Sequence, residues 1–313
     1  MVIRTGVLGY SEGNGHPFSF SAIVNGYDTA AFEQAGWPGI LEYLQREPAE
    51  RFGIGEARIT CAWTQDPRIT GRLCAACKIA RACNRPDDML GQVDAVIVAR
   101  DDWETHAGLA LPFLQHGLPV FVDKPLSLSD DDLVRFEPYL RTGKLMSCSG
   151  LRFARELDSV RNDIAENTFG IPRFISATVL NGMEKYGIHL LEAVAGLSAG
   201  FGTPRSVARL ETPHEAFLMH FGDGTPFILH CLGAVAKTFH LSVFGERGHR
   251  HADLHDNFGA FRRTLERFFA MVSDARPPID PDETLALMAL LARARSLRPG
   301  ESASLGPREH VTA

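Results

Sequence analysis

The sequence predicts an α/β fold with a Rossmann-type doubly wound parallel sheet, followed by a C-terminal α/β domain with a mostly antiparallel, open sheet. Strand and helix patterns alternate strictly up to about Cys148, which is typical of βαβ units. Several strand patterns then follow one another, which is typical of an antiparallel sheet. The 313 residues are enough for two cores. We expect domains at 1–125 and 126–313, with the last helices able to pack back on the first domain.

The alternating half begins with the buried strand Val2–Gly9, which ends in glycine. A loop of turn-forming residues follows, and a helix starts near Phe18. Residues 27–55 contain two prolines and predict an insertion with short helices, one of them at 40–46. The later strands are expected at 57–63, 93–99, 119–122 and 144–148, and the helices between them at 67–82, 105–116 and 129–140. The continuous apolar run at 93–99 is typical of a strand buried on both faces.

The second half starts with a helix at 154–166. Strands are expected at 173–179, 206–210, 216–221, 226–231 and 239–244. Asp223 and Gly224 form the turn of a hairpin, because this pair tolerates the backbone angles of a tight turn. Helices at 257–273 and 282–297 close the fold, and the polar tail from Pro299 is expected to be loose.

Composition excludes several classes of function. The net charge is −6 and no basic run occurs, so we expect no nucleic-acid partner. No apolar run is long enough to cross a bilayer, and the first residues do not form a signal peptide, so we expect no membrane partner and a cytoplasmic protein. Six cysteines are expected to be reduced. The sequence 73–83 is interpreted as one helix with packed cysteines, and no metal site is expected.

The loop after the first strand is a candidate phosphate site. A dinucleotide site needs glycines so that backbone N–H groups can approach a pyrophosphate at a helix N-terminus. The spacing G-x-G-x-x-G is broken here, but a glycine-rich loop with extra donors remains. The candidate cofactor-binding residues of this loop are Gly9, Ser11, Gly13, Asn14 and Gly15. The alternative is a plain strand-to-helix turn.

Polar residues also follow the second and third predicted strands. Thr64 and Asp66 stand where NAD enzymes usually place an acid for the ribose, and nearby arginines could meet a 2′-phosphate, so NAD or NADP remains open. The alternative for both residues is a helix cap. Arg100, Asp101 and His106 follow the third strand at the edge where doubly wound sheets bind ligands, with capping and packing as their alternative roles.

The segment Asp123-Lys124-Pro125 ends the fourth strand. An ammonium group at this position can bond a substrate hydroxyl and stabilise charge during hydride transfer. A second polar segment contains Glu184, Lys185, Tyr186 and His189. A histidine suits proton transfer between alcohol and ketone, although an isolated histidine in an apolar context is more often a core residue.

These segments, in this order, resemble the Gfo/Idh/MocA oxidoreductases. Residues 117–125 are similar to the family signature G-x-x-V-x-x-E-K-P, with Asp123 in place of glutamate. Residues 93–99 with His106 are similar to the third strand and its helix. Further similar segments are 149–153, 170–173 and 278–284.

The resemblance implies a dinucleotide cofactor, NAD or NADP, and a sugar, sugar nucleotide or cyclitol as substrate. It implies that Lys124 contacts the nicotinamide and the substrate hydroxyl, that His189 is the acid/base, and that the open sheet forms the interface of a homo-oligomer, a dimer or tetramer. Asp123 is then a cofactor-binding residue. The implied substrate-binding residues are Arg152, Glu184, Lys185 and Tyr186.

Three departures from the family pattern open alternative functions. The glycine fingerprint is broken, the ribose acid is missing, and Lys185 stands where the family has an aspartate. One alternative is a non-catalytic regulator that binds dinucleotide or sugar. The other is NAD-assisted elimination or glycoside cleavage, which also begins by oxidising a sugar carbon.

Overall fold

The computed structural model describes residues 2–198, 201 and 203–306. The chain forms two compact units. Unit 1 comprises Met1–Phe153 and Asp256–Pro281, and unit 2 comprises Ala154–His255 and Asp282–Ala313. The boundary expected after residue 125 therefore falls inside unit 1, which also receives a later segment of the chain.

Unit 1 contains a six-stranded parallel sheet with the order β3-β2-β1-β4-β5-β6. Its strands are β1 (Ile3–Leu8), β2 (Ala57–Trp63), β3 (Arg81–Ala82), β4 (Ala95–Val98), β5 (Val120–Val122) and β6 (Leu145–Ser147). The strand order reverses between β1 and β4, which is the topological switch point where such sheets bind ligands. The predicted Rossmann-type doubly wound sheet is confirmed.

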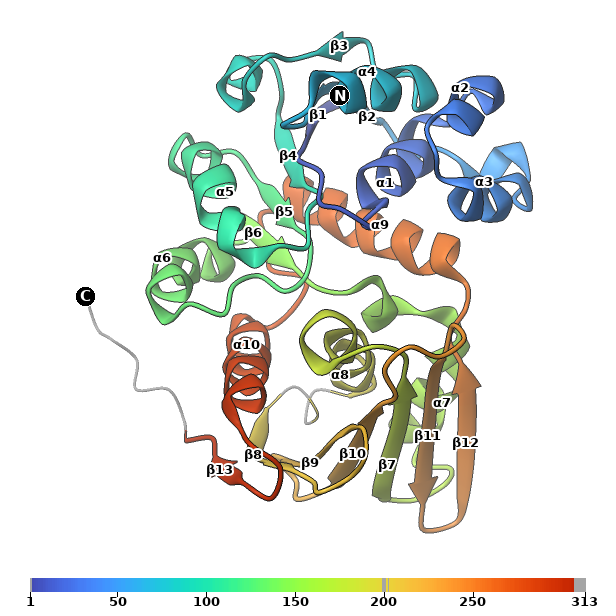
Figure 1. The fold of residues 1–313 in the computed structure, drawn as a ribbon, viewed down its shortest axis with the longest axis vertical. Coiled ribbons are helices and arrows are strands. Elements are labelled where there is room, and N and C mark those ends of the chain that lie inside the picture. The colour runs from blue at the N-terminus through green and yellow to red at the C-terminus, as the bar shows by residue number, and fades with distance from the viewer. Residues whose placement is uncertain (1, 199–200, 202, 307–313) are drawn as a thin grey trace. The chain divides into compact units, whose positions relative to one another are not determined.

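Helices cover both faces of this sheet, with α1 and α9 on one side and α5 and α6 on the other (Figure 1). The helices of unit 1 are α1 (His16–Asn25), α2 (Thr29–Gln34), α3 (Pro38–Gln45), α4 (Pro67–Ala76), α5 (His106–Gln115), α6 (Asp130–Arg141) and α9 (Asn257–Asp274). Short 3-10 turns lie at Ala49–Arg51, Pro86–Met89, Trp103–Thr105 and Gly150–Phe153. Buried aromatic rings join α1, β5 and α9, since Phe121 contacts both Phe20 and Phe268.

The expected helix at 67–82 is wrong in its second half. The helix α4 ends at Ala76, and Lys78 has a left-handed φ of 53°. The chain then forms β3, which pairs with β2 through Cys61–Arg81 and Ala62–Ala82. The cysteines of 73–83 therefore do not share one helix, because Arg81 and Ala82 pair with β2 instead of continuing α4.

Unit 2 contains a seven-stranded sheet with the order β12-β11-β7-β10-β9-β8-β13. Its strands are β7 (Pro172–Val179), β8 (Pro204–Arg209), β9 (Glu215–Phe221), β10 (Pro226–Cys231), β11 (Phe239–Gly245), β12 (Gly248–Asp253) and β13 (Ser302–Ser304). All neighbouring pairs are antiparallel except β7 with β10, so the mostly antiparallel sheet is confirmed. The predicted hairpin joins β9 and β10, with Gly224 at φ 86°.

Two strands of unit 2 were not expected. The polar β12 pairs with β11, and β13 pairs with β8 inside the tail that was expected to be loose. The prediction for 299–306 is thus wrong for the three residues of β13, while residues 307–313 lie outside the described part of the chain. Both strands are short edge strands whose pairing partner, not their own pattern, defines them.

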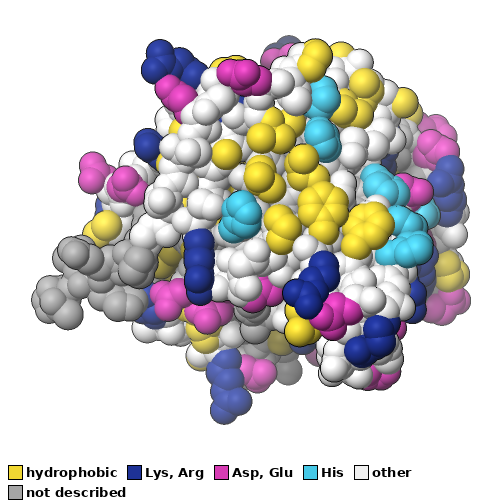
Figure 2. Space-filling view, turned by 90° about the horizontal axis from the view of Figure 1, so that it is seen from below, with side chains coloured by type: hydrophobic (Ala, Val, Ile, Leu, Met, Phe, Trp, Pro, Cys, Tyr) yellow, Lys and Arg dark blue, Asp and Glu magenta, His cyan; other side chains and the backbone are white. Residues whose placement is uncertain are grey.

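The two faces of this second sheet differ in character. One face is buried and apolar, as at Ile175, Phe227 and Leu229. The other face carries histidines bonded to neighbouring strands, including His214 to His230 and Ser242 to His251. Histidine and hydrophobic side chains gather on the face of the molecule seen from below (Figure 2). The expectation that this sheet forms a subunit interface stays a prediction.

The remaining helices belong to unit 2 for all or nearly all of their length. They are α7 (Asp158–Ala165), α8 (Ile188–Ala195) and α10 (Pro281–Ser296), with a 3-10 turn at Arg155–Leu157 and a π turn at Met183–Gly187 before α8. The helix α8 begins directly after this π turn and carries His189 in its first turn. Among the described residues, no helix combines the length and apolar character needed to span a membrane.

Candidate active site in unit 1

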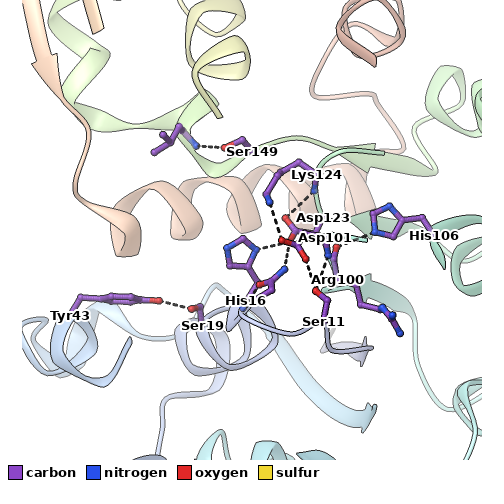
Figure 3. A network of polar contacts seen from close by, with 12 residues as sticks. Ser11, His16, Ser19, Tyr43, Arg100, Asp101, His106, Asp123, Lys124 and Ser149 are labelled. Carbon is purple, nitrogen blue, oxygen red and sulfur yellow. Dashed lines mark hydrogen bonds and ion pairs between the residues drawn. The ribbon is translucent and has the colours of Figure 1, made fainter. Parts of the chain in front are cut away.

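Three loops at the carboxyl edge of the parallel sheet form the candidate site. They follow β1, β4 and β5, which are consecutive in the sheet. In Figure 3 the side chains of Ser11, His16 and Lys124 converge on the carboxylates of Asp101 and Asp123. The sheet order therefore brings together groups that are about a hundred positions apart in the sequence.

Lys124 is a buried cation with a buried carboxylate beside it. Its side chain is 4% exposed, and its Nζ lies 3.7 Å from Oδ2 of Asp101, whose side chain is 6% exposed. The hydroxyl of Ser11 donates to the other oxygen of Asp101 at 2.5 Å. A buried ammonium needs such compensation, because transfer of an unpaired charge from water is costly. The position is thus built to hold a charged amine at the strand end.

Asp123 is the centre of a second set of contacts. Its Oδ2 accepts from Asn14 Nδ2 at 3.1 Å and lies 2.5 Å from Nδ1 of His16. Its Oδ1 accepts from the backbone N–H of Lys124 at 2.9 Å. Burial alone would raise the pKa of Asp123, but the charges of His16 and Lys124 and the hydrogen bonds of His16 and Asn14 outweigh it and hold the pKa well below its usual range. The carboxylate therefore stays ionised at neutral pH.

His16 is a residue of this site that the sequence analysis did not single out. Its imidazole contacts the rings of Phe20 and Phe261, with centroids 5.1 and 4.9 Å away. Its backbone N–H donates to Oδ1 of Asn14 at 2.8 Å. In the sequence it is marked only by its position between Gly15 and Pro17. Its carboxylate partner lies 107 residues further along the chain, so no nearby residue indicates the contact.

The loop after β1 differs from a phosphate-binding loop in its backbone donors. In the first turn of α1, the N–H of His16 bonds to Asn14, Pro17 has no N–H, and Phe18 and Ser19 bond to the carbonyl of Gly15. A Cβ on Gly15 would meet Ile40 Cδ1 at 2.3 Å, so this glycine is needed for packing. The N–H groups of residues 16–19 are therefore used or missing, and only the N–H of the N-cap Gly15 has no bond among the described residues.

Arg100 occupies the space above the first glycine of the loop. Gly9 has a φ of 85°, and a Cβ placed on it would lie 2.3 Å from Cδ of Arg100. The guanidinium bonds Asp102 with Nε at 2.8 Å and with Nη2, and Nη1 reaches Gln65 Oε1 at 3.5 Å. Arg100 thus brings a positive charge to the place where the glycine loop begins, and Gly13 has open space around its Cβ position.

The predicted ribose residues have structural partners at the end of β2. The Thr64 hydroxyl donates to the carbonyl of Asp66 at 2.7 Å. The Asp66 side chain accepts from the N–H of Arg68 at 2.8 Å, caps α4 and pairs with the Arg68 guanidinium. The capping role that the sequence left open is therefore present, and ribose binding stays a prediction.

His106 is fully buried and ties two loops of the site together. Its Nδ1 lies 2.9 Å from the carbonyl of Leu126, and its Nε2 lies 3.0 Å from the carbonyl of Arg100. Burial lowers the pKa of His106. The packing role that the sequence gave as the alternative therefore describes its contacts.

The other predicted substrate residues are distributed over both units. Arg152 is buried in the 3-10 turn Gly150–Phe153, which ends the first segment of unit 1. In unit 2, Glu184 pairs with Arg295 at 2.9 Å, and Lys185 is exposed in the π turn. His189, at the start of α8, contacts Phe239 at 5.6 Å and Tyr186 at 6.0 Å between ring centroids. Their substrate and acid/base roles stay predictions.

The described residues also include cysteines and side chains of the types that bind metal ions. No cluster of three or more His, Cys, Asp or Glu side chains in that part of the chain is arranged to hold a metal ion. All six cysteines are free thiols. Burial raises the pKa of Cys74 to about 11 and that of Cys231 to about 12, so both stay protonated at neutral pH.

Comparison with known families supports the interpretation of this edge. Residues 39–142, which include β5 and Lys124, match the family model described as "Oxidoreductase family, NAD-binding Rossmann fold". The resemblance to the Gfo/Idh/MocA family is confirmed. The sequence matches no curated protein.

Solved structures of low sequence identity share the fold over nearly the full chain. The myo-inositol dehydrogenase from Lactobacillus casei in complex with NAD(H) and myo-inositol is 15% identical, with a TM-score of 0.74 and coverage of 100% of this chain and 99% of that one. The scyllo-inositol dehydrogenase from the same organism, with bound NAD(H) and scyllo-inositol, is 14% identical, with a TM-score of 0.72 and coverage of 94% and 96%. A probable dehydrogenase from Thermotoga maritima is 16% identical, with a TM-score of 0.73 and coverage of 96% and 98%.

Proposed function

We propose that this protein is an NAD(P)-dependent oxidoreductase that transfers hydride to or from a hydroxyl or ketone of a sugar, sugar nucleotide or cyclitol. The observation that carries the proposal is Lys124. It is a buried ammonium at the carboxyl end of β5, beside the switch point of a sheet that matches an NAD-binding family. An ammonium group there can donate to the reacting oxygen and stabilise its negative charge.

The residues at this edge are compatible with a dinucleotide, although not through the usual helix N-terminus. Gly9 has the positive φ of a tight turn, and Arg100 supplies a guanidinium above it. Guanidinium groups bind phosphates in a bidentate manner. Both donors of that fork now bond Asp102, and the N–H of Gly9 bonds the carbonyl of Trp63, so we propose that Arg100 binds the pyrophosphate by exchanging Asp102 for it. The choice between NAD and NADP depends on the end of β2. The Arg68 side chain there is 86% exposed and forms an ion pair with Asp66. It would bind a 2′-phosphate only after this ion pair breaks.

The bound dinucleotide would accept or supply the hydride. The chain's own residues orient the substrate, exclude water and move the hydroxyl proton. Lys124 would hold the substrate oxygen, and Arg152, Glu184, Lys185 and Tyr186 are the proposed substrate contacts. By resemblance His189 is a proposed acid/base. Inositols are the first substrates to test, because two of the similar structures contain them.

The test combines cofactor binding with turnover. We expect the protein to bind NADH or NADPH in a fluorescence titration and to reduce NAD or NADP with one member of a cyclitol and sugar panel. Lys124→Met should lower kcat by a factor of about 10² or more, since one oxyanion contact contributes that amount. Lys237→Met, at an exposed position, is the matched control. A Lys124→Met protein that is folded and turns over at the wild-type rate would remove Lys124 from the chemistry.

A second candidate function is a non-catalytic regulator that binds dinucleotide or sugar. The observation that favours it is the first turn of α1, in which every backbone donor is used or missing. Tight ligand binding without cofactor reduction over the whole panel would support it. NAD-assisted elimination is a catalytic variant of the first proposal and would show transient NADH without net reduction.

A further inference from the structure

His16 and Asp123 form an imidazole–carboxylate pair within unit 1. The Nδ1 atom lies 2.5 Å from Oδ2 of Asp123, and the His16 side chain is 20% exposed. Among the described residues, this is the hydrogen bond that the ring makes, and Nε2 bonds to no protein group. One ring nitrogen is thus fixed, while the other is open to a ligand.

The carboxylate determines which nitrogen carries the proton. Asp123 is held ionised, and an ionised carboxylate can only accept hydrogen bonds. Nδ1 must therefore be the donor, and in the neutral ring the lone pair is at Nε2. This is the arrangement in which an aspartate orients a histidine so that its second nitrogen acts as a base.

The pair is also held rigidly. Asn14 contacts both partners, since its Nδ2 donates to Asp123 and its Oδ1 accepts from the backbone of His16. Phe20 and Phe261 pack against the ring. A base held by packing and hydrogen bonds loses little entropy when it meets a substrate.

The pair stands beside the cation that the proposed reaction uses. Asp123 precedes Lys124 in the chain and accepts its backbone N–H. Figure 3 draws Asp101 and Lys124 beside this pair, together with Arg100. An ammonium group and an oriented base therefore belong to the same unit and the same edge of the sheet.

We propose that His16 is the proton acceptor of the oxidoreductase, and that Asp123 is its positioning residue. This inference rests on the proposed function. As the alcohol is oxidised, the hydroxyl proton passes to Nε2 of His16 and the hydride of the same carbon passes to the oxidised nicotinamide. The alcohol becomes a ketone and the ring becomes an imidazolium, which later releases the proton to water. In the reverse direction the imidazolium returns the proton to the alkoxide.

The test separates His16 from the histidine expected by resemblance. His16→Gln should lower kcat for alcohol oxidation by a factor of about 10² to 10⁴, the range for general acid–base catalysis. Its dissociation constant for NADH should stay within about threefold, because dinucleotide contacts are left in place. The pH profile of kcat should also change, because the variant lacks the proton acceptor. His116→Gln, an exposed histidine of unit 1, is the matched control.

A second measurement does not depend on turnover. Nitrogen NMR of labelled histidine should show His16 of the wild type with its proton on Nδ1, and Asp123→Asn should shift it towards Nε2. The inference is overturned if the wild-type ring carries its proton on Nε2 alone. It is also overturned if His16→Gln keeps the wild-type kcat and pH profile while His189→Gln loses turnover, a result that leaves the proposed function intact. A wild-type protein that neither binds nor reduces a dinucleotide removes both proposals together.

Discussion

Replacement of Asp123 by asparagine tests the contact network at the carboxyl edge of β5. The carboxylate accepts three hydrogen bonds, from His16, Asn14 and the backbone of Lys124. An amide has one oxygen and one NH₂ group, so it cannot accept all three. If the amide oxygen serves the backbone N–H, its NH₂ faces Nδ2 of Asn14 and drives His16 to the other tautomer. If the oxygen serves the side chains, its NH₂ faces the N–H of Lys124.

The size of the loss follows from these contacts. One buried donor left without an acceptor costs about 1–3 kcal/mol. Loss of one partner from a buried ion pair costs about 3–5 kcal/mol. Lys124 keeps Asp101 as a partner, so we expect the low end of that range, about 3 kcal/mol. For a domain of this size that corresponds to a fall in Tm of about 6–12 °C.

Tryptophan fluorescence can measure this loss in unit 1 alone. All three tryptophans, Trp37, Trp63 and Trp103, belong to unit 1, so urea unfolding followed by their emission reports on that unit. Asp274→Asn removes the same charge at an exposed position of unit 1, and should change the free energy of unfolding by less than about 0.5 kcal/mol. An Asp123→Asn midpoint equal to that of the wild type would refute the assignment of Asp123 as a central acceptor.

The pH dependence of the same measurement has a definite sign. The pKa of Asp123 is lower in the folded protein than its ordinary value of 3.8. Its stabilising contribution is therefore fully present above that value and is lost as the pH falls through the folded pKa. The difference between wild type and Asp123→Asn should shrink as the pH falls into the acid range. A difference that grows on acidification would contradict the direction of this shift.

Three further changes test other parts of the fold. Gly9→Ala should destabilise unit 1 by more than Gly13→Ala. A side chain at either positive φ costs about 1–2 kcal/mol, but only the methyl group at residue 9 displaces Arg100. Equal losses of stability in urea unfolding would show that Arg100 is not held there. Phe227→Ala should destabilise unit 2 by about 3–5 kcal/mol, since the ring is fully buried, and faster amide exchange in β9 and β10 would report it; unchanged exchange would argue against this core. Cys74 should react with iodoacetamide about a hundredfold more slowly at pH 8 than a free thiol, because burial raises its pKa to about 11. Mass spectrometry can follow the alkylation, and a rate equal to that of a free thiol would contradict this prediction.

Elements with a strong local pattern could be predicted from the sequence. The run Ala95–Val98 is apolar throughout and forms β4, and the helix predicted from residue 129 is α6, which Ser129 caps. Elements that depend on a partner were missed. The strand β12 is polar and rich in histidine, and β13 has only three residues, so neither has an apolar alternation that marks a strand. They are strands because β11 and β8 offer edges to pair with.

The residues of the candidate site also fall into those that a local pattern predicts and those that depend on a distant partner. The sequence by itself determined the strands and helices that have a strong local pattern, the glycine turn at Gly9 and the strand end at Asp123 and Lys124, because period and turn chemistry are local properties of the chain. Only the tertiary structure decided that Asp101 faces Lys124 and that Asp123 holds His16. The sheet order places the ends of β1, β4 and β5 side by side, so residues 107 positions apart come within hydrogen-bond distance. No local sequence pattern predicts the short distance between His16 and Asp123, because the strand order of the whole sheet sets it.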